Sequence, residues 1–141
     1  MKKFLIVFLV VLLALCSFGC KPKEITLAEL TSRKEGGGPL RYEKDSYTIV
    51  EVYFYGSKGD SDGKTNYCYV QTNYYKYSPS SPSGKMYDHC ETAEYSCTFT
   101  DCTLTIDGSD NYSYSVETRD GKDYVVFSKP FLGVTEWYID K

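Results

Sequence analysis

Six cysteines and a single histidine are the residues of this 141-residue chain best suited to chemistry. Cys68, Cys90, Cys97 and Cys102 lie well beyond the N-terminal segment, and this even number suits two disulfides in an oxidising compartment. The spacing leaves all three pairings open, and the short second loop favours Cys68–Cys90 with Cys97–Cys102. A zinc site with His89 replacing one thiolate is the alternative, but the paired CxxC spacing of structural zinc sites is missing. We therefore expect disulfides and no metal.

The other reactive residues argue against catalysis. The sequence contains no nucleophile elbow and no cysteine beside a base, and the lone His89 excludes sites that need two imidazoles. Nothing places two of the 19 acidic residues together as a catalytic pair. The net charge of −3 argues against a nucleic-acid partner, which would require a basic face. We expect no enzyme activity and no cofactor.

The first 19 residues have the layout of a signal peptide. Lys2 and Lys3 precede an uninterrupted apolar stretch from Phe4 to Leu15, and charge resumes at Lys21. The apolar stretch is short for a membrane span. We therefore expect export of the chain and removal of residues 1–19.

The residues Ser17-Phe18-Gly19-Cys20 resemble the lipobox of bacterial lipoproteins. The resemblance implies that Cys20 becomes the new N-terminus and carries a lipid, which would hold the protein on a membrane of the cell envelope. Two alternatives remain, namely soluble secretion after ordinary cleavage and retention of the stretch as an uncleaved anchor. The count of cysteines favours the lipoprotein, because loss of Cys16 and acylation of Cys20 leave an even number for disulfides.

Residues 20–46 read as a lipid-anchored tether with little structure. Thr26 and Glu29 have the spacing of a helix capping box, and Leu27 and Leu30 would lie on one side of a short helix. A helix of this length is marginal alone, so we expect mainly a spacer.

From residue 47 to residue 141 the pattern indicates β-structure. Val50, Val52 and Phe54 alternate with polar residues and tyrosines, and Cys68 and Val70 do the same on the next strand. Further strands are expected at 97–106, 112–117, 124–127 and 135–139, with turns at Asp107-Gly108 and Asp120-Gly121 and a stop at Pro130. We expect a small antiparallel sandwich or barrel, bonded by disulfides.

Tyrosine is abundant enough to serve both packing and binding, with 15 residues in the chain. Tyr53, Tyr55, Tyr67 and Tyr69 face away from the side occupied by Val52 and its neighbours, and they would form an aromatic platform for a protein or a glycan. The alternative is that they stabilise the sheet as cross-strand pairs.

The segment Ser83-Gly84-Lys85-Met86-Tyr87 resembles the SGxxY motif of bacterial lipoproteins that inhibit C-type lysozymes, which are small disulfide-bonded β-barrels. In that family the loop enters the lysozyme cleft, so the resemblance implies that Ser83 and Tyr87 are the contacting residues. The second motif of the family, an aromatic residue followed by Trp-Lys-Gly, is absent.

These patterns together predict an exported, lipid-anchored β-domain that binds a partner or supports the envelope without catalysis. The alternatives are inhibition of C-type lysozyme and transport of a small apolar ligand inside a barrel.

Overall fold

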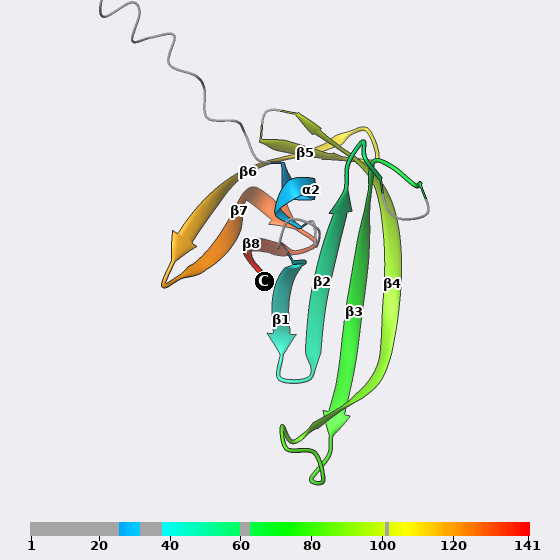
Figure 1. The fold of residues 1–141 in the computed structure, drawn as a ribbon, viewed down its shortest axis with the longest axis vertical. Helices are drawn as coiled ribbons and strands as arrows, with labels where there is room; N and C mark the ends of the chain where they lie inside the picture. The colour runs from blue at the N-terminus through cyan, green and yellow to red at the C-terminus, as the bar shows by residue number, and fades with distance from the viewer. Residues whose placement is uncertain (1–25, 32–37, 60–62, 101) are drawn as a thin grey trace, which may run out of the picture.

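The computed structural model describes residues 26–31, 38–59, 63–100 and 102–141 of the chain. These residues form a closed antiparallel barrel of eight strands, in which each strand pairs with the next along the chain (Figure 1). One short helix, α2 (Leu27–Leu30), lies at one end of the barrel (Figure 1). The strands are β1 (Leu40–Asp45), β2 (Thr48–Tyr55), β3 (Tyr67–Tyr77), β4 (Lys85–Thr100), β5 (Thr103–Ile106), β6 (Asp110–Arg119), β7 (Lys122–Phe131) and β8 (Val134–Ile139). The expected all-β antiparallel fold is confirmed, as a barrel.

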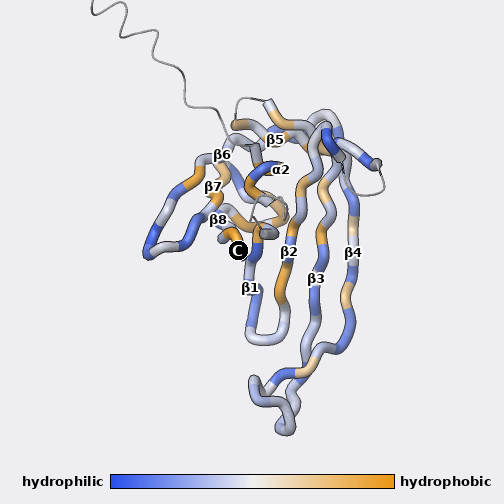
Figure 2. The backbone as a smooth tube through the Cα atoms, viewed as in Figure 1, coloured by the Kyte–Doolittle hydropathy of each residue, from blue (hydrophilic) through white to orange (hydrophobic). Residues whose placement is uncertain are grey.

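The longest wall of the barrel is made by β2, β3 and β4. Val52 lies opposite Val70, and Phe54 lies opposite Cys68. All four side chains are buried, as their alternation in the sequence predicts. In Figure 2 hydrophobic and hydrophilic residues alternate along β2 and β3, so one face of these strands contributes to the core.

Aromatic rings fill much of the interior. Phe131 packs against Phe127 at 5.1 Å and against Trp137 at 5.9 Å between ring centroids. Tyr67 and Tyr114 are also buried, so tyrosine takes part in the packing, as its abundance predicts.

Two Asp-Gly pairs form the hairpin turns expected from the sequence. Asp107 and Gly108 have φ values of 49° and 75°, and Asp120 and Gly121 have values of 51° and 75°. Positive values at both central residues are typical of hairpin turns that match the twist of the strands. Asp120-Gly121 forms a two-residue loop, and the other loop also includes Ser109.

The N-terminal part of the barrel differs from expectation, since residues 20–46 were expected to be a tether. β1 instead pairs with β2, with Leu40 opposite Val52, and Leu27 is 0% exposed within the core.

The capping box of α2 forms as predicted, because the Thr26 side chain accepts from the Glu29 backbone N–H and the Glu29 carboxylate accepts from the Thr26 backbone N–H. Where β2 continues past the first residue of β1, the Thr31 hydroxyl accepts a hydrogen bond from the backbone N–H of Phe54 at 3.3 Å. Helix α2 therefore covers an edge of β2 and belongs to the folded unit.

Two details of the strands also differ from the sequence prediction. β4 begins at Lys85, whereas the predicted strand begins at Cys97, because the exposed first half of β4 shows no hydrophobic alternation. Pro130 lies within β7 and does not end it. The pairing of β7 with β8 is interrupted between Val126 and Phe131, and proline is tolerated at such an irregularity because no ladder hydrogen bond is lost.

Candidate functional site

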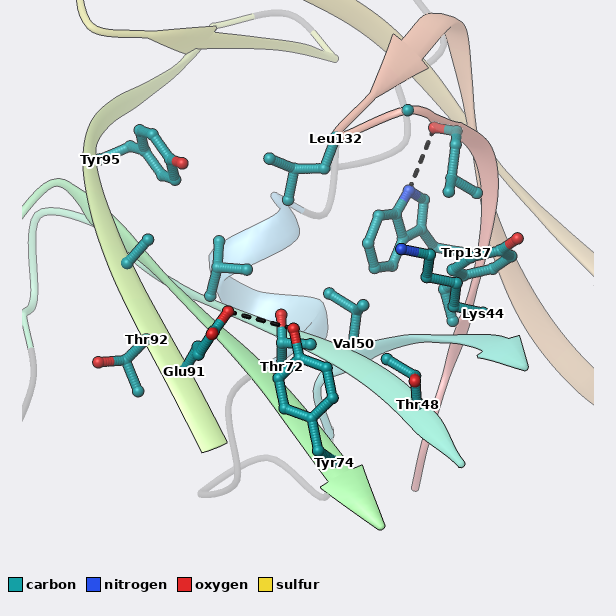
Figure 3. Close-up of a pocket in the computed structure, with 15 residues that line it drawn as sticks. Lys44, Thr48, Val50, Thr72, Tyr74, Glu91, Thr92, Tyr95, Leu132 and Trp137 are labelled. Atoms are coloured by element: carbon teal, nitrogen blue, oxygen red, sulfur yellow. Dashed lines mark hydrogen bonds between the residues drawn. The ribbon is translucent and has the colours of Figure 1, made fainter. Parts of the chain in front are cut away.

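A groove opens into the barrel on the inner side of the long wall. Its volume is about 540 Å³, and it is bordered by β1, β2, β3 and β4 on one side and by the β7–β8 turn with Trp137 on the other (Figure 3). The strand register brings Val50 opposite Thr72 and Val70 opposite Ala93, so these side chains line the groove together. A pocket of this size lies in the range of small-molecule sites.

The inner end of the groove is apolar and firmly packed. Trp137 is 1% exposed, its ring lies 5.9 Å from that of Tyr42, and its indole N–H donates to the carbonyl of Val134 at 3.3 Å (Figure 3). Because the only polar atom of the indole side chain is bonded, the ring presents an apolar surface to its neighbours.

Polar groups gather at the mouth of the groove. The Tyr74 hydroxyl donates to Glu91 Oε2 at 3.1 Å (Figure 3). The Tyr74 ring stacks on His89 with centroids 4.6 Å apart. The hydrogen bond to the Glu91 carboxylate raises the pKa of Tyr74 above its usual value, because it stabilises the protonated phenol. Among the described residues, Glu91 and Lys44 at this mouth form no ion pair. Both charges are therefore available to a ligand.

Leu132 projects from the β7–β8 turn at the groove (Figure 3). It is 42% exposed and has a φ of 51°, followed by Gly133 at 82°. A leucine in the left-handed region is uncommon and costs conformational energy, and exposure of its apolar side chain adds no packing. Local strain of this kind is concentrated at functional sites.

The four tyrosines that were expected to form a platform instead pair with one another across β2 and β3. Tyr55 stacks on Tyr67 at 4.7 Å between centroids, and Tyr53 lies 6.5 Å from Tyr69. Tyr67 is only 7% exposed, and the other three rings are half-buried. This arrangement is that of cross-strand pairs that stabilise the sheet, and it does not form an open aromatic surface.

Ser83 and Tyr87 lie at the hairpin between β3 and β4, away from the groove. The loop is held by bonds from Ser78 N–H to the Gly84 carbonyl at 3.0 Å and from Gly84 N–H to the Ser81 carbonyl at 2.9 Å. Tyr87 is 52% exposed and meets Tyr75 edge to face at 6.0 Å. The structure thus brings both residues to the tip of one protruding hairpin (Figure 1).

The positions of the cysteines do not favour the pairing of Cys68 with Cys90 and Cys97 with Cys102. Cys68 and Cys97 are both buried and share a hydrogen bond between their thiols, which with burial raises the pKa of Cys97 far above its usual value. Cys90 lies opposite Asn73, and Cys68 lies opposite Tyr95, so Cys68 and Cys90 are separated by about 17 Å along the ladder. All four cysteines are free thiols in this structure, and only Cys68 and Cys97 adjoin.

Cys102 lies just beyond the end of β4, five positions along the chain from Cys97 and twelve from Cys90. Cys20 and the expected signal peptide lie outside the described residues. Within the part of the chain that the structure describes, no helix has the length and apolarity to cross a membrane, and no group of three or more His, Cys, Asp or Glu could hold a metal ion.

The groove was not found from the sequence. Its wall residues come from β1 to β4 and its other side from the β7–β8 turn, so no short motif joins them. The one local signal is Leu132-Gly133, where a hairpin turn carries leucine in place of asparagine or aspartate. Comparisons of the chain with models of protein families, with curated proteins and with solved structures gave no match.

Proposed function

We propose that this chain is an exported, lipid-anchored protein of a bacterial cell envelope that binds a small amphiphilic ligand in its groove without catalysis. The signal-like first 19 residues and the lipobox-like segment ending at Cys20 support export and anchoring. The groove supports binding, and it is the observation that carries the proposal.

The chemistry of the groove limits what it can hold. Val50, Val70 and Trp137 offer an apolar surface for a hydrocarbon or aromatic group. Glu91 and Lys44 at the mouth can orient a polar or charged head group. A ligand with an apolar body and a polar end fits both parts.

A fluorescent fatty acid with a dansyl group tests this proposal. Titration into the full chain in mild detergent below its micellar concentration should give saturable enhancement of the dansyl emission, with energy transfer from Trp137. Ala93→Trp fills the groove and should weaken binding by about tenfold or more, which corresponds to about 1.4 kcal/mol. Val116→Trp adds the same ring at an exposed position on β6 and serves as the control. Equal affinities of the two variants would refute the groove as the site.

Inhibition of C-type lysozyme is a second candidate function. The observation that favours it is the exposed position of Ser83 and Tyr87 at the tip of an ordered hairpin, where both can enter a cleft. The purified chain at micromolar concentration should slow a C-type lysozyme, and Ser83→Ala with Tyr87→Ala should relieve the inhibition. Tyr77→Ala removes an exposed tyrosine of the same hairpin outside the motif and is the control. Absence of inhibition by the unaltered chain would remove this candidate.

We also propose that Cys68 and Cys97 form a disulfide after export, when an exchanging disulfide of the oxidising compartment takes up two electrons and two protons from their thiols. Their adjacent, buried thiols support this pairing, since they are diagonal neighbours on β3 and β4 and require little movement to bond. This pairing replaces Cys68–Cys90 and Cys97–Cys102 as the one favoured for the chain.

A further inference from the structure

Two strands that border the groove each contain a β-bulge, and both bulges lie beside its mouth. In β1 the pairing with β2 skips Lys44, whose two neighbours face successive residues of β2. In β4 the pairing with β3 skips Asp88 in the same way. A bulge changes the direction of nearby side chains, and bulges are frequent beside functional sites. The side chains that these two bulges direct are therefore candidates for ligand contact.

The bulge in β4 decides which way Glu91 points. Before the bulge, Tyr87 lies opposite Tyr75 on the outer face of the wall. After it, Glu91 lies opposite Thr72 on the inner face, and both line the groove. Without the extra residue, the alternation of side chains would place position 91 on the same outer face as Tyr87. The bulge thus turns the Glu91 carboxylate into the groove.

The bulge in β1 has the corresponding effect on Lys44. This side chain lines the groove together with Thr48 of the neighbouring strand (Figure 3). The adjacent Asp45 uses its carboxylate in the hairpin turn, where it accepts from the Tyr47 backbone N–H at 2.7 Å. Lys44 forms no ion pair within the part of the chain that the structure describes. Its positive charge is therefore directed to the groove and not used by the fold.

The wall keeps these two opposite charges apart. Thr48 and Tyr74 lie between them and face each other across β2 and β3. The Glu91 carboxylate reaches over β3, where it accepts from the Tyr74 hydroxyl at 3.1 Å. About two strand spacings, or about 10 Å, then separate it from the Lys44 backbone, and the lysine side chain spans part of this gap. One head group of small size can therefore contact both charges.

Both charged groups have capacity for further hydrogen bonds. The two oxygens of a carboxylate offer about four acceptor positions, and the Tyr74 hydroxyl uses one of those of Glu91. A primary ammonium has three N–H donors for the others, and Lys44 has three donors for a phosphate. A head group with a negative charge alone would satisfy Lys44 but bring that charge near Glu91, which is unfavourable.

We propose that the groove binds a zwitterionic amphiphile of the phosphoethanolamine class, with its phosphate at Lys44 and its primary ammonium at Glu91. The complementary charges of the mouth support this class, since such complementarity mainly provides specificity. The inference rests on the proposed function of the groove and adds the identity of the head group.

Two lipids that differ only at the ammonium test the head group. Lysophosphatidylethanolamine carries both charges, and its N-acetyl derivative keeps the acyl chain and the phosphate but lacks the positive charge. Each is titrated into the full chain below its micellar concentration, and the emission of Trp137, the sole tryptophan, reports binding at the groove. The unaltered chain should bind the zwitterionic lipid about fivefold more tightly than the N-acetyl derivative.

Variants of the two charged residues assign the contacts. Glu91→Gln keeps an oxygen for the Tyr74 hydroxyl, and it should remove the preference by weakening only the zwitterionic lipid. Lys44→Gln should weaken both lipids by a similar factor, because both keep the phosphate. Glu94→Gln removes an acid from the outer face of the same strand and is the control, which should keep the preference. A preference that survives Glu91→Gln would overturn the proposal.

Further measurements separate failure of the head group from failure of the groove. Equal binding of the two lipids, weakened by Ala93→Trp, would overturn the zwitterionic head group while the function of the groove stands. Binding of the dansyl fatty acid without either lipid would have the same meaning. Absence of binding by all three would remove both proposals.

The head group without its chain tests whether the ligand is an amphiphile. Glycerophosphoethanolamine should bind at least about tenfold more weakly than the lipid, because it leaves the apolar surface of Val50, Val70 and Trp137 uncovered. Equal affinities of the head group and the lipid would indicate a water-soluble zwitterion and overturn the proposed class.

Discussion

Leu132 occupies a turn position that asparagine or glycine would fill with less strain. Its φ of 51° and its exposed side chain at the groove are both unfavourable for stability, so its role is best sought in ligand contact. Leu132→Asn should raise the free energy of unfolding by about 0.5–1 kcal/mol and weaken binding of the dansyl fatty acid. Urea titration and fluorescence measure the two effects.

The control for this change is Asp120→Asn, which alters a turn residue with the same φ of 51° far from the groove. It should change stability by less than about 0.5 kcal/mol and leave binding unaltered, since aspartate already tolerates this conformation. A Leu132→Asn variant that binds as well as the unaltered chain would remove Leu132 from the site.

The Cys68–Cys97 pair is a second feature at the scale of single residues. A disulfide here closes a loop through most of β3 and β4, and such a loop contributes about 3–4 kcal/mol in the chain-entropy model. Peptide mass spectrometry of the exported chain should recover residues 68 and 97 in one cross-linked fragment. Reduction should then lower the melting temperature of the unaltered chain but not that of Cys68→Ala with Cys97→Ala. Fragments joining Cys68 to Cys90 would contradict this pairing.

At the scale of elements, helix α2 should act as part of the barrel. Leu27 is 0% exposed and Leu30 is half-buried against the same core. Leu27→Ala should therefore cost about 2–4 kcal/mol, and Leu30→Ala should cost clearly less, because the loss grows with the cavity left behind. Urea unfolding measures both variants. If Leu27→Ala had no effect, residues 26–31 would be a spacer after all.

The elements divide into those that the sequence predicts and those that it does not. β2, the first part of β3 and the Asp-Gly turns follow from local alternation and turn chemistry, because the residues that decide them are adjacent. The first half of β4 has few apolar residues and is held by its ladder to β3, so only tertiary pairing determines it. β1 is short, and its pairing with β2 and β8 is equally non-local.

The candidate site depends on the barrel more than on any element. Glu91, Tyr74 and Lys44 reach one mouth only because β1 to β4 curl together, and Trp137 reaches it from the last strand. The sequence pattern favours the outer tyrosines instead, but their role depends on the strand register that pairs them across β2 and β3. A short motif can name Ser83 and Tyr87 together, because a single hairpin carries both.

For the whole molecule, the decisive expectation concerns attachment to a membrane. The barrel's described residues begin at Thr26, close along the chain to Cys20, so a lipid on Cys20 would tether the α2 end. Cys20→Ser should abolish labelling by radioactive palmitate and move the protein from the membrane fraction to the soluble fraction, because one anchored sulfur is the only proposed attachment. Cys16→Ser changes a cysteine of the expected signal peptide and should leave both unchanged. If Cys20→Ser stayed with the membranes, the lipid anchor would be refuted, and the groove would then be that of a protein held by other means.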